Sequence, residues 1–290
     1  MVETYGADEC RTYFVAETVY GQTPANPAML GINTQGVEPE LDPTLIKVMG
    51  IGSRDLQSLY RGLRRVTLKV PNALSGQSPI SFIQHVQTLS SLSVQILYFK
   101  GLWGSATDII SFLYNGCKID KLTVGSNLED IIKANVELIG QNLTMATAKI
   151  TGATYGDYAG AVPFNAVDVK KGDPSGGSAI ALTDVTDWKF MIENNLKPVG
   201  IITSAATGVM LKYLRPRNRK LSGEVTMEFE DKTEFDEIIN DAEFSLSFGL
   251  GGSNSALFKN CKWEPVSLPT RIEDLVSVKA KFVARDVWIS

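Results

Sequence analysis

An internal repeat is the feature that most constrains the fold of this 290-residue chain. The stretch 101–105 (GLWGS) recurs as 249–253 (GLGGS), with four of five residues identical. Further on, 113–143 aligns without a gap onto 257–287, with five identities in 31 positions, where chance composition would give roughly two. The identical pairs are Leu113/Leu257, Cys117/Cys261, Lys118/Lys262, Glu129/Glu273 and Asp130/Asp274. The repeat predicts two similar domains in one chain.

The hydrophobic pattern supports the repeat more strongly than the identities do. Apolar residues alternate with polar ones at 132–138 and, at the same offset, at 276–282. Strict alternation predicts a half-buried strand, and both strands have the same phase. A slip of one residue would turn either strand inside out, so the shared phase is informative. The alternative, two unrelated β segments, stays open at this stage.

Each copy is expected to contain several strands and one short helix. In the first copy the strands are expected at Leu45–Met49, Val66–Val70, Ser93–Phe99, Lys118–Val124 and Ile131–Leu138, with a long polar excursion over Gly50–Arg65. A helix is expected over Ser78–Leu89, with Pro79 near its first turn and Phe82, Ile83 and Val86 as its apolar stripe. The second copy repeats the order with strands at Val225–Phe229 and Phe244–Phe248 around a helix at Lys232–Asp241, whose inward residues would be Phe235, Ile238 and Ile239.

These elements predict a mostly β protein of two tandem antiparallel β-sandwich or partial-barrel domains, each with a flanking short α-helix. The first domain is expected over 1–150 and the second over 184–290. Residues 151–183 are rich in Gly, Ala and Asp, a composition typical of a linker or an exposed loop.

Composition excludes several function classes. A net charge of −4 gives no excess of Lys and Arg for general nucleic-acid binding. The acidic N-terminus lacks the apolar core of a signal peptide, and the longest apolar stretch, Val199–Leu211, is too short to span a bilayer. Three widely spaced cysteines fit free thiols in a reducing cytoplasm better than a disulfide framework.

Enzymatic signals are poor, so no catalytic residue, cofactor or metal site is expected. His85 is the only histidine, and no zinc site or Ser-His-Asp set can be built around it. Its position predicts a surface or helix-packing role. Gly50-Ile51-Gly52 lacks the strand-to-helix context of a dinucleotide site and is interpreted as a turn. The four tryptophans are expected in the core or in subunit contacts, and Cys117 and Cys261 in equivalent core sites.

Three segments resemble the tail tube proteins of tailed bacterial and archaeal viruses. Residues 13–24 (YFVAETVYGQTP) resemble the family's opening strand, which runs into Glu-x-x-Tyr-Gly-x-x-Pro. Residues 115–140 and 260–282 resemble its later hairpin. The resemblance implies small β-sandwich domains whose sheets join around an axis to line a pore, typically six domains to a ring. Since this chain carries two such domains, we expect three chains in a ring with pseudo-sixfold symmetry.

Stacking of rings requires a second interface, and two basic stretches with apolar centres are the candidates. In the resembling family a long loop at the position of Gly50–Arg65 contacts the next ring, and Lys212–Lys220 has a similar composition. The candidate stacking residues are Arg54, Asp55, Leu59, Tyr60, Arg61, Arg64, Arg65, Tyr213, Arg215, Arg217, Arg219 and Lys220. Acidic surfaces such as Glu228–Asp231 are expected to receive them, which would make stacking salt-sensitive.

The resemblance implies a structural protein of the virion tail, made in the host cytoplasm and not associated with membranes. Its partners would be further copies of itself and other tail proteins (tape measure, terminator and baseplate), and DNA would pass through the lumen without specific binding. A baseplate hub, a distal tail protein or a contractile-secretion tube of the same fold is the alternative. The basic stretches also leave open nucleic-acid binding and a solvated loop without a partner.

Overall fold

The computed structural model describes residues 4–73, 78–104, 106, 108–158, 161–163, 168–202, 209–268 and 276–290. The chain is mostly β, as expected, with two α-helices. Within these residues neither helix has the length and hydrophobicity needed to cross a membrane. Glu273 and Asp274, which belong to the sequence repeat, lie outside the described residues.

Among the described residues, the first half of the chain contains one short 3₁₀ turn, eleven strands and one helix. These elements are η1 Ala7–Glu9, β1 Cys10–Ala16, β2 Ala28–Gly31, β3 Glu38–Asp42, β4 Leu45–Met49, β5 Leu56–Arg61, β6 Arg65–Ala73, α1 Ser78–Thr88, β7 Leu92–Phe99, β8 Ile109–Asn127, β9 Lys133–Gly140, β10 Asn142–Ala146 and β11 Thr154–Tyr155. The expected excursion over Gly50–Arg65 therefore contains a strand, β5, which pairs with β4 as a hairpin.

The second half contains ten strands and one helix among the described residues. They are β12 Val169–Gly172, β13 Ile180–Leu182, β14 Val185–Glu193, β15 Lys197–Ile202, β16 Val209–Arg215, β17 Lys220–Glu228, α2 Thr233–Ile239, β18 Phe244–Gly249, β19 Ser255–Ser267, β20 Ser277–Val283 and β21 Asp286–Ile289. Residues 151–183, expected as a linker, thus include β11, β12 and β13.

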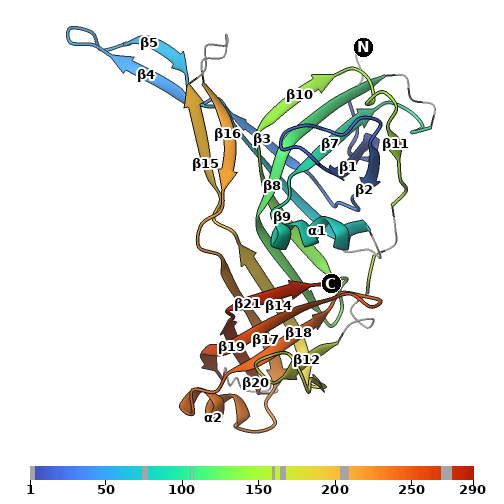
Figure 1. The fold of residues 1–290 in the computed structure, drawn as a ribbon, viewed down its shortest axis with the longest axis vertical. Coiled ribbons are helices and arrows are strands. Elements are labelled where there is room, and N and C mark those ends of the chain that lie inside the picture. The colour runs from blue at the N-terminus through green and yellow to red at the C-terminus, as the bar shows by residue number, and fades with distance from the viewer. Residues whose placement is uncertain are drawn as a thin grey trace.

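Eight strands form one continuous antiparallel layer, here called the central sheet. Its order is β3-β6-β9-β8-β14-β17-β20-β19, and it is open at both ends. Two flanking sheets accompany the central sheet, β2-β1-β7-β8-β10 in the first half and β13-β12-β18-β19-β21 in the second. Figure 1 shows the two halves one above the other, with the hairpins β4–β5 and β15–β16 leaving these sheets on the same side.

The long strands β8 and β19 each belong to two sheets. Residues 109–117 of β8 pair with β7, and residues 118–125 pair with β9. Just before the change of partner, Gly116 has a φ of 63°. In β19 the partner changes between Cys261 and Lys262, and Asn260 just before it has a φ of 50°. Glycine and asparagine adopt this left-handed conformation more readily than other residues do. The residue types at positions 116 and 260 therefore favour the two bends.

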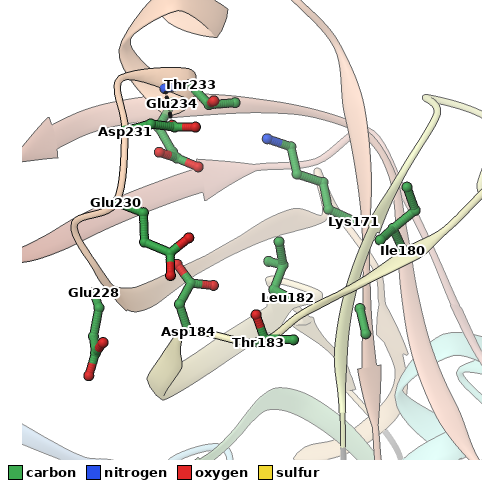
Figure 2. Close-up of a pocket in the computed structure, with 11 residues that line it drawn as sticks. Lys171, Ile180, Leu182, Thr183, Asp184, Glu228, Glu230, Asp231, Thr233 and Glu234 are labelled. Carbon is green, nitrogen blue, oxygen red and sulfur yellow. Dashed lines mark hydrogen bonds between the residues drawn. The ribbon is translucent and has the colours of Figure 1, made fainter.

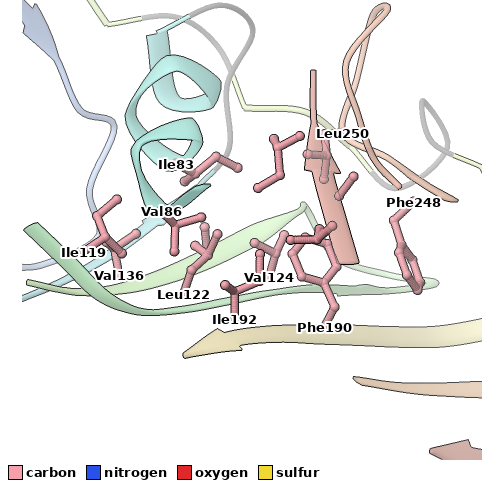
Figure 3. Packing of buried hydrophobic residues seen from close by; sticks show 14 of the residues in the cluster. Ile83, Val86, Ile119, Leu122, Val124, Val136, Phe190, Ile192, Phe248 and Leu250 are labelled. Atoms are coloured by element: carbon pink, nitrogen blue, oxygen red, sulfur yellow. The ribbon is translucent and has the colours of Figure 1, made fainter. Parts of the chain in front are cut away.

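The core lies between the central and flanking sheets and runs through both halves without a break. Figure 3 shows Ile83 and Val86 of α1 packed over Leu122 and Val124 of β8, with Phe190 and Ile192 of β14 beside them. The predicted apolar stripe of α1 is confirmed, because Phe82, Ile83 and Val86 are all buried. Cys117 and Cys261 are buried too, as expected.

The predicted inward face of the second helix is wrong. Ile238 is exposed and Ile239 is 78% exposed, and α2 has no buried residue. The position facing the sheet is held by Glu237, whose carboxylate accepts a hydrogen bond from Trp263 Nε1 at 2.7 Å and pairs with Lys171 Nζ at 2.6 Å. A helix of seven residues has too few turns for a full apolar stripe.

Candidate functional site

The β4–β5 hairpin projects from the sheets (Figure 1), and many of its apolar side chains are exposed. Within the described residues β4 and β5 pair only with each other, with Lys47 opposite Leu59 and Ile46 opposite Tyr60. A lone two-stranded ribbon is marginally stable in water. Its exposed large apolar residues are Leu45, Ile46, Val48, Met49, Ile51, Leu56, Leu59 and Tyr60. A contiguous apolar surface of this kind marks a protein interaction site.

The β15–β16 hairpin projects in the same way but is anchored at its root. Leu196, Leu211 and Leu214 form a small buried cluster there, packed against residues of the first half. Farther out, Ile202 is 90% exposed, and Tyr213, which lies between Leu211 and Leu214 along β16, is 41% exposed. The described part of this hairpin therefore has a fixed base and an uncovered shaft.

Polar contacts with the first half fix the chain where β14 leads into β15. The side-chain amide of Asn194 donates hydrogen bonds to the carbonyls of Val86 at 2.9 Å and Ile119 at 3.0 Å. The N–H of Leu196 donates to Asp120 Oδ1 at 2.6 Å. Burial raises the pKa of Asp120, although this hydrogen bond opposes the shift, and nearby Glu137 and Glu193 raise it further.

The twelve predicted stacking residues all lie on the two hairpins or at their bases, at three levels. At the tip of β4–β5 lie Arg54 and Asp55. On the hairpin strands, as exposed apolar side chains, are Leu59, Tyr60 and Tyr213. Near the roots are Arg61, Arg64, Arg65, Arg215, Arg217, Arg219 and Lys220. Of these, Arg219 is already paired with Asp286 at 3.0 Å. A role of the twelve in stacking stays a prediction.

An acidic pocket lies in the second half between the β13–β14 turn and the start of α2. Its volume is about 350 Å³. Figure 2 shows carboxylates from Asp184, Glu228, Glu230, Asp231 and Glu234 around it. The one lysine in its lining, Lys171, is paired with Glu237, outside the pocket lining. The pocket is thus strongly anionic, and it includes the acidic stretch that the sequence predicted as a receiver for basic loops.

The two halves are joined edge to edge inside the central sheet. Strands β8 and β14 pair in antiparallel fashion from Asp187 opposite Asn127 to Glu193 opposite Lys121. On the core side Ile192 lies opposite Leu122, and both are fully buried. On the open side Lys121 and Glu193 form an ion pair at 3.3 Å. This junction, here called the internal junction, is a complete strand-to-strand interface between equivalent layers.

Sequence reasoning missed the apolar residues of β4 and the open edges of the central sheet. Apolar residues are concentrated at 45–49 (Leu45, Ile46, Val48 and Met49) and again at 56–60 (Leu56, Leu59 and Tyr60), on either side of the turn at Gly50–Gly52, and this is the signal for a hairpin that is apolar on both faces. The open edges have no sequence signal, because they depend on which strands become neighbours in space.

One comparison with known proteins identifies the chain's relatives. A family model described as "Phage tail tube protein" matches residues 8–281, nearly the whole chain. No curated protein sequence matches the chain.

Proposed function

Because the chain belongs to the phage tail tube protein family, we propose that it polymerises as stacked rings around a channel for viral DNA. In this role it is a structural protein of the virion tail, without a catalytic function. Its partners are further copies of itself and the tail proteins that start, measure and end the tube. The open, mostly β architecture with two projecting hairpins supports an assembly role.

The chain consists of two copies of one tube domain, and the strand registers support this division. The pairs Ile119–Leu138 and Leu122–Val136 of β8–β9 recur, shifted by 144 residues, as Trp263–Phe282 and Val266–Ala280 of β19–β20. The flanking sheets follow the same shift in β8 and β19, since Cys117 faces Leu92 and Cys261 faces Phe244. A bulge follows in both places.

The same comparison supports an earlier start of the second domain, at β12. Val169 of β12 pairs with Phe248 of β18, as Thr12 of β1 pairs with Ile96 of β7. Strand β13 then flanks β12 as β2 flanks β1. We therefore divide the chain near residue 168 rather than at 184.

Two domains per chain imply three chains per ring with pseudo-sixfold symmetry. The observation that carries this proposal is the internal junction, in which β8 and β14 join the two domains through paired edges. A ring made of like domains repeats one junction around its axis, and a junction that closes by rotation gives a ring rather than a filament. Three of the six junctions are then internal and three join neighbouring chains.

Stacking uses the two hairpins. Apolar shafts with basic roots fit an interface that buries Tyr, Leu and Arg side chains, and the acidic pocket around Glu230 and Asp231 is their proposed receiver in the next ring. Opposite charges attract less at high ionic strength, so stacking weakens with added salt. The net charge of −4 disfavours tight contact with passing DNA, whose phosphates bind basic surfaces.

Negative-stain electron microscopy of the purified, concentrated protein tests the proposal. Hollow tubes or stacked rings are expected at low salt, with shorter stacks at high salt. Closed single rings at every salt concentration would instead favour a baseplate hub or distal tail protein of the same fold. A persistent monomer at high protein concentration would contradict self-assembly.

A further inference from the structure

Among the described residues, each end of the central sheet is formed by a strand with a neighbour on one side only, β3 at one end and the last part of β19 at the other. The corresponding strands at the internal junction, β14 and β8, have a neighbour on both sides. Strand β3 pairs only with β6 among the described residues, and all five of its residues are exposed. The last residues of β19 pair only with β20 there. Unpaired strand edges of this kind readily accept a strand from another chain.

The internal junction gives the rule for pairing these two edges. Strand β14 lies against β17 as β3 lies against β6, so Ile192 corresponds to Leu41 and Phe190 to Pro39. On the other side β8 corresponds to β19, so Leu122 corresponds to Val266. The internal junction is therefore a template whose two sides recur, unpaired, at the two ends of the sheet.

We propose that β3 of one chain pairs in antiparallel fashion with the end of β19 of a second copy, in the register of the internal junction. Leu41 then lies opposite Val266 of the neighbouring copy, Glu40 opposite Ser267, and Pro39 opposite Leu268. The inference rests on the proposed function and deepens it, because it names the strands and residues that join one chain to the next.

Burial at the two sites supports this register. In the internal junction the core-side residues Trp188, Phe190 and Ile192 are buried. The corresponding apolar residues at the free edges are uncovered, with Leu41 44% exposed and Leu268 37% exposed. Pairing in this register brings both onto the core side of a continued sheet, where covering them is favourable.

Charge on the open side of the sheet supports it as well. Strand β3 presents three carboxylates, from Glu38, Glu40 and Asp42, on this side. The strand next to β19 is β20, in which Lys279 lies opposite Ser267. Lys279 and Lys281 are exposed, and neither forms an ion pair within the described residues. Two strand spacings, about 10 Å between backbones, lie within reach of facing Glu and Lys side chains.

Two prolines bear on an opposing explanation, in which both edges are merely protected against pairing. Pro39 lies in β3 and Pro265 in β19, and proline is found at edge strands because it lacks an N–H donor. Each removes a single donor and leaves the neighbouring residues free to pair.

Paired cysteines test the register directly, in a Cys10→Ser background. One variant carries Leu41→Cys with Val266→Cys, and a second carries Glu40→Cys with Ser267→Cys. Adjacent pairs alternate between hydrogen-bonded and non-hydrogen-bonded positions, so the two variants sample both geometries. The matched control carries Glu40→Cys with Val266→Cys, whose side chains point to opposite faces. Within one chain the two edges are seven strand spacings apart, about 30 Å, too far for a disulfide.

After mild oxidation, the expected result is reducible disulfide-linked trimers on a denaturing gel for at least one matched pair and none for the control. If electron microscopy of the same samples reveals rings or tubes but neither matched pair cross-links, the register is wrong and the proposed function stands. If no variant and no unmodified protein assembles under any condition, the proposed function itself is contradicted, and the junction with it.

Discussion

At the scale of single residues, the bends in β8 and β19 differ in how much space they leave. Both Gly116 and Asn260 have positive φ angles. A Cβ added at Gly116 would lie 2.7 Å from Cβ of Gln141, closer than two carbon atoms that are not bonded to each other can approach. Only glycine therefore fits at 116, whereas asparagine already occupies the corresponding bend at 260.

Replacing Gly116 with alanine should destabilise the protein by roughly 1–3 kcal/mol, through backbone strain and the contact with Gln141. The matched change Asn260→Gly keeps the bend and should alter the free energy of unfolding by less than about 1 kcal/mol. Urea denaturation followed by tryptophan fluorescence measures both values. Equal effects of the two substitutions would contradict this account of the bends.

Asp120 is a second residue whose environment leads to a testable prediction, because it changes the pKa of the carboxyl group. Burial raises the pKa of its carboxyl group in the folded protein. A raised folded-state pKa means that protonation favours folding, so its contribution is present at low pH and is lost as the pH rises through the folded-state pKa. At neutral pH the ionised group therefore costs stability, while its oxygen still accepts the Leu196 N–H bond.

Asp120→Asn should consequently raise the melting temperature at pH 7, because the amide keeps an acceptor and removes the charge. The gain should shrink as the pH falls toward about 4, near the ordinary pKa of aspartate. Asp120→Ala is the control, since it leaves the Leu196 N–H without an acceptor and should cost roughly 1–3 kcal/mol. An Asn variant whose effect does not change with pH would argue against the raised pKa.

At the scale of elements, we expect the exposed side chains of the hairpins to matter for assembly and to contribute little to the stability of the single chain. Strands β4 and β5 pair only with each other within the described residues and their large apolar side chains are exposed, so these side chains add little to the stability of the isolated chain. Their apolar surface instead becomes useful when a partner covers it. Leu59 and Tyr60 lie on opposite faces of the ribbon, because successive side chains of a strand alternate.

The double substitution Leu59→Asp with Tyr60→Asp should therefore leave the free energy of unfolding within about 0.5 kcal/mol of wild type. It should raise the protein concentration needed for tube formation by roughly tenfold or more. A tenfold change corresponds to about 1.4 kcal/mol in the free energy of adding one chain to the tube. Light scattering during assembly measures this concentration. Met145→Asp on β10 is the matched control, with a similarly exposed side chain that lies on neither hairpin nor in the acidic pocket, and it should assemble normally.

Local elements could be predicted from the sequence wherever a strong period was present. The helix at Ser78–Thr88 matches its prediction within a residue or two because its apolar spacing is regular, and the strand at Leu45–Met49 matches because it is a short, mostly apolar run that ends at Gly50. The second helix lies within its predicted range, but its predicted inward face is wrong because a carboxylate, Glu237, holds the inward position through contacts with Lys171 and Trp263. Such a contact joins segments far apart in the chain and leaves no local pattern.

Only part of the candidate site can be predicted from the sequence, because the rest depends on which segments lie side by side in space. The basic residues and Tyr60 can be recognised in the sequence by composition. The projection of the hairpin cannot, because it depends on β4 and β5 having no other strand beside them within the described residues. The edges at β3 and β19 depend on the order of eight strands in one sheet. Strand order is set by tertiary packing rather than by local propensity.

At the scale of the whole molecule, the central sheet holds both halves of the chain in a single open layer. Its internal junction joins the halves through paired edges, and its two ends present the corresponding edges unpaired within the described residues. The chain therefore already contains one of the junctions that we propose for a complete ring. The two hairpins leave these sheets on one side and carry the separate surface that we propose for stacking.

The number of chains in one ring tests the central claim most directly. Electron cryomicroscopy of assembled rings or tubes, averaged end-on without imposed symmetry, gives this number. We predict three chains per ring, seen as six similar domains whose junctions alternate between internal and intermolecular. Six chains per ring, or three chains joined through surfaces other than the edges of the central sheet, would contradict the account.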